Sequence, residues 1–147
     1  MKQTLAIVAA LSVALYVLAL AVPLDPDEQR PGTRLAGTQI DTPVTDWSFH
    51  QPGTQVYLQT RTWYGIPHSV TTTSMVYDNQ LIIPCGWCGD KRWPKNVAAD
   101  PAVVVKIGDR LYPFNAVRIE DPALMHAMLG GQHGQVPDVQ LYRMTPR

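Results

Sequence analysis

Charged residues are scarce in this sequence, and neither sign is in excess. Lys and Arg number 12, Asp and Glu also number 12, and together they make up 16% of the 147 residues. About 25% is usual for a soluble domain. A nucleic-acid-binding protein normally carries a basic excess, so a net charge of zero argues against that function. The two cysteines are too few for a scaffold held by several disulfides.

The low charge reflects one long apolar run near the N-terminus. Leu5 to Val22 is interrupted only by Ser12 and Tyr16, and as a helix it would be about 27 Å long, close to the hydrocarbon thickness of a bilayer. We therefore predict an uncleaved single-span membrane anchor over residues 1–24. A cleaved signal segment is the alternative, because Ala19-Leu20-Ala21 has the small-x-small pattern of a cleavage site.

The orientation of this segment decides where the rest of the chain lies. A very short N-terminal tail usually stays in the cytoplasm, so we expect the following domain outside it, in the periplasm, or secreted after cleavage. Residues 25–46 are rich in Pro, Gly and Thr and have no apolar period, which predicts a tether. Residues 47–147 then remain for one domain with a single core.

Strand-like patterns dominate that domain. Val56 and Leu58 alternate with polar neighbours, and residues 68–77 are mostly β-branched. Asp78-Asn79 and Gly108-Asp109 have the composition of tight turns, so each predicts a hairpin.

Two short helices are expected between and after the hairpins. The first covers residues 91–99 and ends at Asp100-Pro101, because a residue before proline is disfavoured in helical conformation. The second covers residues 122–129, with Asp121 as its N-cap and proline at its first position. The order of elements predicts a mainly β fold with short helices, in which the strands form a small barrel.

Cys85 and Cys88 form a C-x-x-C motif directly after a predicted strand. Haem attachment is excluded because Gly89, not histidine, follows the second cysteine. A structural zinc site would need a second cysteine pair or closely spaced histidines, and neither is present. Three interpretations stay open: a local disulfide, two unremarkable thiols, or a redox-active dithiol.

A basic and aromatic cluster opens the first predicted helix. Lys91, Arg92 and Lys95 flank Trp93 within five residues. Helix-start N–H groups and cations bind anions, and an indole suits a flat ring, so the cluster would fit a phosphorylated aromatic cofactor. A solvated basic turn with Trp93 in the core is the alternative.

A polar and aromatic turn precedes residues 68–77. It runs from Thr60 to Ser69 and contains Trp63, Tyr64 and His68. Turns of this composition often line pockets. The alternative is that Trp63 and Tyr64 plug a barrel end and that His68 is structural.

The chain resembles the flavin-binding split-barrel superfamily, that is, pyridoxamine-phosphate-oxidase-like proteins and especially the deazaflavin-dependent nitroreductase-like branch. The similarity covers about residues 55–120, and its best part is the stretch from Lys91 to Asp109, K-R-W-P-K-N-V-A-A-D-P-A-V-V-V-K-I-G-D. The resemblance implies a six-stranded split β-barrel after the N-terminal helix. It also implies FMN or a deazaflavin as cofactor, and a homodimer.

The resemblance further implies site residues. Phosphate-side roles fall on Lys91, Arg92, Trp93 and Asn96, to which the basic cluster adds Lys95. Ring-side or substrate-side roles fall on Arg61, His68 and Ser69.

We therefore predict a membrane-tethered oxidoreductase that passes a hydride to a small organic acceptor. His68 or Tyr64 would donate a hydrogen bond or a proton to that acceptor. A non-catalytic split barrel that binds a small ligand or a partner at the membrane surface is the alternative.

Overall fold

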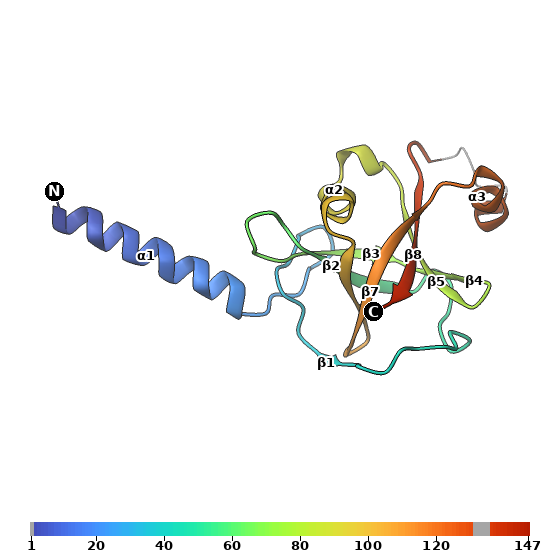
Figure 1. Ribbon diagram of the computed structural model, residues 1–147, viewed down its shortest axis with the longest axis horizontal. Coiled ribbons are helices and arrows are strands. Elements are labelled where there is room, and N and C mark those ends of the chain that lie inside the picture. The colour runs from blue at the N-terminus through green and yellow to red at the C-terminus, as the bar shows by residue number, and fades with distance from the viewer. Residues whose placement is uncertain (1, 131–135) are drawn as a thin grey trace.

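The computed structural model describes residues 2–130 and 136–147, which form one long helix and a β-barrel with two short α-helices (Figure 1). The helices are α1 (Lys2–Ala21), the 3-10 helix η1 (Cys88–Asp90), α2 (Arg92–Ala99) and α3 (Pro122–Leu129). The strands are β1 (Thr38–Gln39), β2 (Gln55–Thr60), β3 (His68–Thr73), β4 (Met75–Tyr77), β5 (Gln80–Cys85), β6 (Ala102–Ile107), β7 (Arg110–Ile119) and β8 (Gln140–Pro146).

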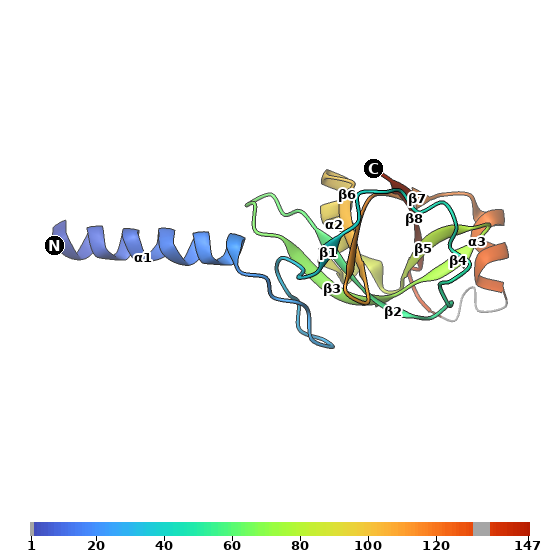
Figure 2. The same cartoon turned by 90° about the horizontal axis from the view of Figure 1, so that it is seen from below.

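The strands pair in the order β3-β2-β6-β7-β8-β5-β4, and β1 pairs with β7 outside that path. The two ends of the path, β3 and β4, are separated in the chain only by Ser74, so the sheet closes into a barrel. Figure 2 shows the strands around the barrel interior, with α3 on the side away from α1.

The mainly β class and the barrel are confirmed, but the expected count of six strands is wrong, because the sheet has eight. One additional strand arises where the run 68–77 bends at Ser74. Before the bend it pairs with β2, and after it with β5. The other is the short β1, which lies in the segment predicted as a tether.

The predicted hairpins and helices are confirmed. Asp78 and Asn79 adopt φ values of 49° and 54°, the left-handed conformation that a tight β4–β5 turn requires. Asp121 caps α3 by accepting from the backbone N–H groups of Ala123 and Leu124, which satisfies two donors that have no partner within the helix.

The core fills the barrel. Buried apolar residues alternate with partly exposed ones along β2, and its buried apolar residues are Val56 and Leu58. Ile83, Val105 and Phe114 meet them from other strands. Burying each such side chain stabilises the fold by about 1.5–3 kcal/mol. A smaller apolar cluster lies between α3 and the outer face of β5, β7 and β8.

Helix α1 contacts the barrel little. Its window from Gln3 to Ala21 has a mean hydropathy of 2.5 and is 0% buried. A helix of this length and composition can cross a membrane, and a signal sequence has the same properties.

Residues 25–46, predicted as a tether, make specific contacts with the barrel. Asp25 forms an ion pair with Lys106 of β6 at 2.5 Å. Leu35 is buried, and its N–H donates to the side-chain oxygen of Gln59. The backbone N–H groups of Gly32 and Ser69 of β3 each donate to the other residue's carbonyl oxygen. A freely moving spacer would make none of these contacts, so this segment contributes to the wall of the domain.

Candidate functional site

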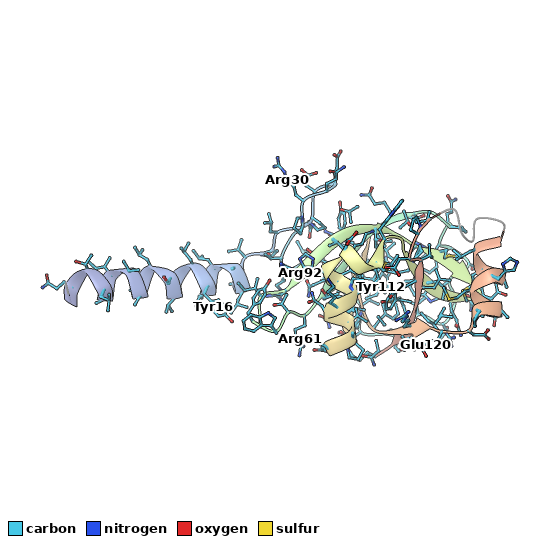
Figure 3. The ribbon with its side chains drawn as sticks, turned by 90° about the horizontal axis from the view of Figure 1, so that it is seen from above. Tyr16, Arg30, Arg61, Arg92, Tyr112 and Glu120 are labelled. Atoms are coloured by element: carbon cyan, nitrogen blue, oxygen red, sulfur yellow. A yellow bond between two sulfur atoms is a disulfide. The ribbon has the colours of Figure 1, made fainter. Side chains whose placement is uncertain are left out.

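A cavity of about 460 Å³ lies where α2 begins, between β3 and residues 28–31. A volume of this size is typical of sites for small molecules and cofactors. Its lining residues are Glu28, Gln29, Arg30, Pro31, His68, Val70, Thr71, Thr72, Lys91, Arg92 and Trp93. Figure 3 shows Arg92 at the start of α2 and Arg30 on the neighbouring segment.

The cavity has an excess of positive charge. Arg30, Lys91 and Arg92 contribute three cations and Glu28 one carboxylate, since His68 is counted as neutral. In the part of the chain that the structure describes, the salt bridges join Arg61 to Asp100 and Lys106 to Asp25. The three cavity cations therefore keep their charge available for an anionic ligand.

The start of α2 is fixed by its aromatic residue. Trp93 is buried, and its ring packs edge-on against Tyr142 with 4.8 Å between centroids. Trp93, Pro94 and Val97 form the buried face of α2, whereas Lys91 and Arg92 stay exposed. Packing of the indole thus places both cations at the cavity. Backbone N–H groups at a helix start favour an anion at the same place.

His68 lies at the other wall of the cavity, at the start of β3. It is partly buried, and burial lowers the pKa of its imidazole below the ordinary 6.5, with a smaller lowering from the charge of Arg92. His68 is therefore neutral at pH 7, and a neutral imidazole offers one N–H donor and one acceptor. This state suits a hydrogen bond to a ligand better than release of a proton.

Tyr64 lies beside the cavity rather than in its lining. Its hydroxyl accepts a hydrogen bond from Nη1 of Arg92 at 3.3 Å. This hydrogen bond orients the guanidinium of Arg92 and links the turn before β3 to α2.

A second hollow of about 640 Å³ adjoins the first and shares Thr71, Thr72 and Lys91 with it. Apolar side chains form much of its wall: Met75, Trp87, Met128, Leu129, Val136 and Val139. The two hollows form a groove along β3 with a cationic end and an apolar end. This arrangement suits a ligand that has an anionic tail and a flat, less polar body.

An unsatisfied hydroxyl also points to a ligand in the groove. Oγ1 of Thr71 is buried and has no hydrogen-bond partner among residues 2–130 and 136–147, and Thr71 lines both hollows. Buried polar groups normally have a partner. A hydroxyl of this kind, together with three cations, fits a phosphorylated cofactor.

Cys85 and Cys88 form a disulfide. Both sulfur-bearing residues are buried, with exposed fractions of 2% and 1%. Of the three interpretations of the motif, the local disulfide is the one that the structure contains. Its burial separates it from the cavity lining and from solvent.

Comparisons with known proteins bear on the fold. No protein-family model and no curated protein sequence matches the chain. Solved structures do match, including General Stress Protein 26 from Bacillus anthracis str. Sterne, with a TM-score of 0.51, 17% identity, and coverage of 64% of this chain and 80% of that one. A NimC/NimA family protein from Clostridium acetobutylicum matches with a TM-score of 0.50, 12% identity, and coverage of 62% and 73%.

The domain has the split-barrel fold that these structures share. The resemblance seen in the sequence is thereby confirmed for the fold. A protein of unknown function from Agrobacterium tumefaciens str. C58 also matches, with a TM-score of 0.51 and 18% identity. The match covers 64% of this chain but only 48% of that longer protein. Identities this low show the shared fold alone.

The split barrel brings together only part of the predicted site. His68, Lys91, Arg92 and Trp93 line one cavity, as expected for residues that act on one ligand. Their grouping could be predicted because three of them are consecutive in the sequence.

Elsewhere on the split barrel lie four other predicted residues, namely Lys95, Asn96, Arg61 and Ser69. Lys95 lines a different hollow, with Ala98 and Tyr142. Asn96 donates to the hydroxyl of Thr60 at 2.9 Å. Arg61 forms an ion pair with Asp100 at 3.4 Å, at the surface.

Ser69 is fully buried beneath the segment that contains Gly32. A Cβ on Gly32 would lie 2.1 Å from the carbonyl oxygen of Leu24 and 2.6 Å from Oγ of Ser69. Only glycine allows this close approach. The sequence therefore did carry one signal that residues 25–46 contact the barrel, namely a glycine after Pro31.

Residues 28–31, Thr71 and Thr72 line the cavity, but no sequence pattern indicated them. Residues 28–31 belong to a polar segment without period, in which sequence cannot separate a linker from a pocket wall. The two threonines lie in a run of β-branched residues. Which of them faces the cavity depends on how β3 pairs with β2, and this pairing cannot be read from the run alone.

Proposed function

We propose that the protein is a membrane-tethered split-barrel oxidoreductase that uses FMN or a deazaflavin to transfer a hydride to a small organic acceptor. The observation that carries the proposal is the cavity in which Arg30, Lys91 and Arg92 form no salt bridge with any other described residue and adjoin an apolar hollow. A phosphate at the cationic end and a ring along β3 would use both parts.

Within this proposal, Lys91, Arg92 and Arg30 hold the phosphate, and charge-assisted hydrogen bonds of this kind are the strong ones. Thr71 supplies a hydroxyl that otherwise has no partner. Either cofactor, when bound, accepts and returns a hydride. His68, neutral because of its lowered pKa, donates a hydrogen bond that stabilises negative charge on the ring or the acceptor.

The test of cofactor use is a binding titration on the purified full chain in detergent micelles, with FMN and with a deazaflavin, followed by fluorescence and absorbance. The full chain is needed because residues 25–31 contribute to the cavity and to the Asp25–Lys106 pair. We expect one cofactor to bind and, once reduced, to be reoxidised by an organic acceptor without oxygen. A folded protein that binds neither would end the proposal.

A non-catalytic ligand-binding split barrel is the second candidate, and Glu28 favours it. Glu28 places a carboxylate among the lining residues, where it would repel a phosphate and attract a cationic group. Binding of a cationic ligand to the full chain, with an affinity that Glu28→Gln lowers, would support this second candidate over the first.

We further propose that α1 is an uncleaved anchor and that the barrel lies outside the cytoplasm. The Cys85–Cys88 disulfide supports this location, because disulfides persist mainly in oxidising compartments. Protease added to spheroplasts, which lack an intact outer membrane, should digest the barrel and leave α1 in the membrane. Release of the barrel without α1 into the soluble fraction would support a cleaved signal instead.

A homodimer is also proposed, on the resemblance to split barrels. Light scattering of the purified protein in detergent, corrected for bound detergent, should give twice the chain mass. A monomer mass at cofactor-binding concentrations would refute this part.

A further inference from the structure

The turn between β2 and β3 ends in an unusually exposed aromatic residue. Within residues 61–67, here called the Trp63 loop, the indole of Trp63 is 94% exposed. Large aromatic side chains supply much of the energy of cores and interfaces, and tryptophan is rarely left in water at a loop tip. The loop also has no acidic residue, and it begins with the exposed Arg61.

The Trp63 loop lies against the last turns of α1. The hydroxyl of Tyr16 donates to the backbone carbonyl of Tyr64 at 2.7 Å. A Cβ on Gly65 would lie 2.9 Å from that same hydroxyl, so helix and loop are in contact. Figure 3 shows Tyr16 on the side of α1 that faces the loop.

This contact sets the depth of the loop relative to a bilayer. Tyr16 precedes the end of α1 at Ala21 by five residues, which is about 7.5 Å along the helix axis. A run of about 27 Å must use nearly all of its length to cross hydrocarbon about 30 Å thick. If α1 spans the membrane, the loop beside Tyr16 therefore reaches the interface between headgroups and acyl chains.

The residues of the Trp63 loop suit that interface. Trp and Tyr are enriched there because their rings are apolar on one side and carry a polar group on the other. Trp63 and Tyr64 pack edge-on, with 5.3 Å between ring centroids. Arg61 begins the loop and is exposed, and Arg92, also exposed, donates to the hydroxyl of Tyr64 in the loop.

We propose that the Trp63 loop is a second membrane contact, in which the indole of Trp63 inserts into the interface of the bilayer that α1 spans. This inference goes beyond the proposed oxidoreductase and depends on α1 remaining attached, not on any cofactor. Because Tyr64 accepts from Arg92, the contact would also hold the cationic end of the groove close to the lipid surface.

The test uses the full chain reconstituted in phosphatidylcholine and phosphatidylglycerol vesicles in which part of the lipid carries bromine on the acyl chains. Bromine quenches tryptophan fluorescence at short range. Trp47 and Trp93 are buried, and Trp87 is the other exposed tryptophan, at 54%. Trp63→Phe is therefore compared with Trp87→Phe as a matched control.

We expect bromolipid to quench the parent and the Trp87→Phe protein, and Trp63→Phe to lose most of that quenching. Equal quenching of Trp63→Phe and the parent would overturn the proposal. So would a Trp63 emission that aqueous iodide quenches in vesicles as strongly as it quenches a fully exposed tryptophan.

Two controls show whether a loss of quenching comes from misfolding or from a failure of α1 to span the membrane. Thermal unfolding of Trp63→Phe should match the parent, because an exposed side chain contributes little to the fold. Alkaline carbonate extraction reports on α1 alone, and all variants should stay with the membrane. Release of the parent by carbonate would show that α1 does not span and would also overturn the proposal.

Discussion

Asn96 of α2 donates a hydrogen bond to the hydroxyl of Thr60, the last residue of β2, at 2.9 Å. The same hydroxyl donates to the carbonyl oxygen of His68 across the β2–β3 pair. Asn96 therefore ties the cation-bearing helix to the strand pair that carries His68. Its part in the candidate site is to hold both walls in register.

This bond predicts a measurable coupling. Asn96→Ala should lower the free energy of unfolding by about 1 kcal/mol, the usual net contribution of such a bond. Thr60→Val should cost a similar amount, and the double variant should cost less than the sum, because each change removes the same bond. The measurement is thermal or urea unfolding in detergent. Strict additivity would contradict the coupling.

The titration of His68 provides a second prediction. Burial is the larger cause of its lowered pKa and the charge of Arg92 the smaller. Arg92→Gln should therefore raise the pKa of His68 but leave it below 6.5. NMR titration of the imidazole protons measures both values. A pKa of His68 that does not change in Arg92→Gln would contradict the proximity of the two groups.

Lowered histidine pKa values also make stability depend on pH. Burial lowers the pKa of His50, which pairs with Ser74 at 2.6 Å, as it lowers that of His68. Below pH 6.5 the unfolded chain binds protons that the folded chain does not, so stability should fall as pH falls from 6.5 toward the folded pKa values. Melting temperatures between pH 8 and pH 5 should show this decline, and His50→Gln should reduce its size.

The ion pair between Asp25 and Lys106 predicts that residues 25–46 belong to the folded unit. The side chain of Lys106 is only 10% exposed, so Asp25→Asn should lower the free energy of unfolding by about 2 kcal/mol, less than for a fully buried pair. Asp27→Asn, at an exposed neighbour, is the control and should have little effect. Equal stability of the two variants would mean that the segment is a free tether after all.

The sequence was most informative where patterns are local. The turn at Asp78-Asn79, the cap at Asp121 and the basic start of α2 each depend on a few consecutive residues, and the structure contains all three. Grouping of Lys91, Arg92 and Trp93 at one cavity follows from that same local pattern.

Long-range contacts could not be read in the same way. The contribution of Glu28 and Arg30 to the cavity depends on pairing between Gly32 and Ser69, which are 37 residues apart in sequence. Lys95 lines a different hollow from Lys91 and Arg92. Spacing predicted one basic cluster, but the helix divides it between two hollows.

The disulfide allows a prediction about the thiol-redox interpretation. Cys85→Ala/Cys88→Ala should lower the free energy of unfolding by about 2 kcal/mol, the chain-entropy value for so short a loop. Cofactor affinity should be unchanged, because neither cysteine lines the cavity. Loss of activity with intact cofactor binding would instead support a redox role for the pair.

The most direct test of the central claim compares two cations on one helix. Arg92 lines the groove and Lys95 does not, although both are exposed on α2. Titrating the full-length variants with FMN and deazaflavin, we predict that Arg92→Glu weakens binding by about tenfold or more, since a charge-assisted hydrogen bond contributes about 1.5–3 kcal/mol. Lys95→Glu should leave the affinity nearly unchanged. Equal effects of the two substitutions, or none from Arg92→Glu, would contradict the assignment of this cavity as the cofactor phosphate site.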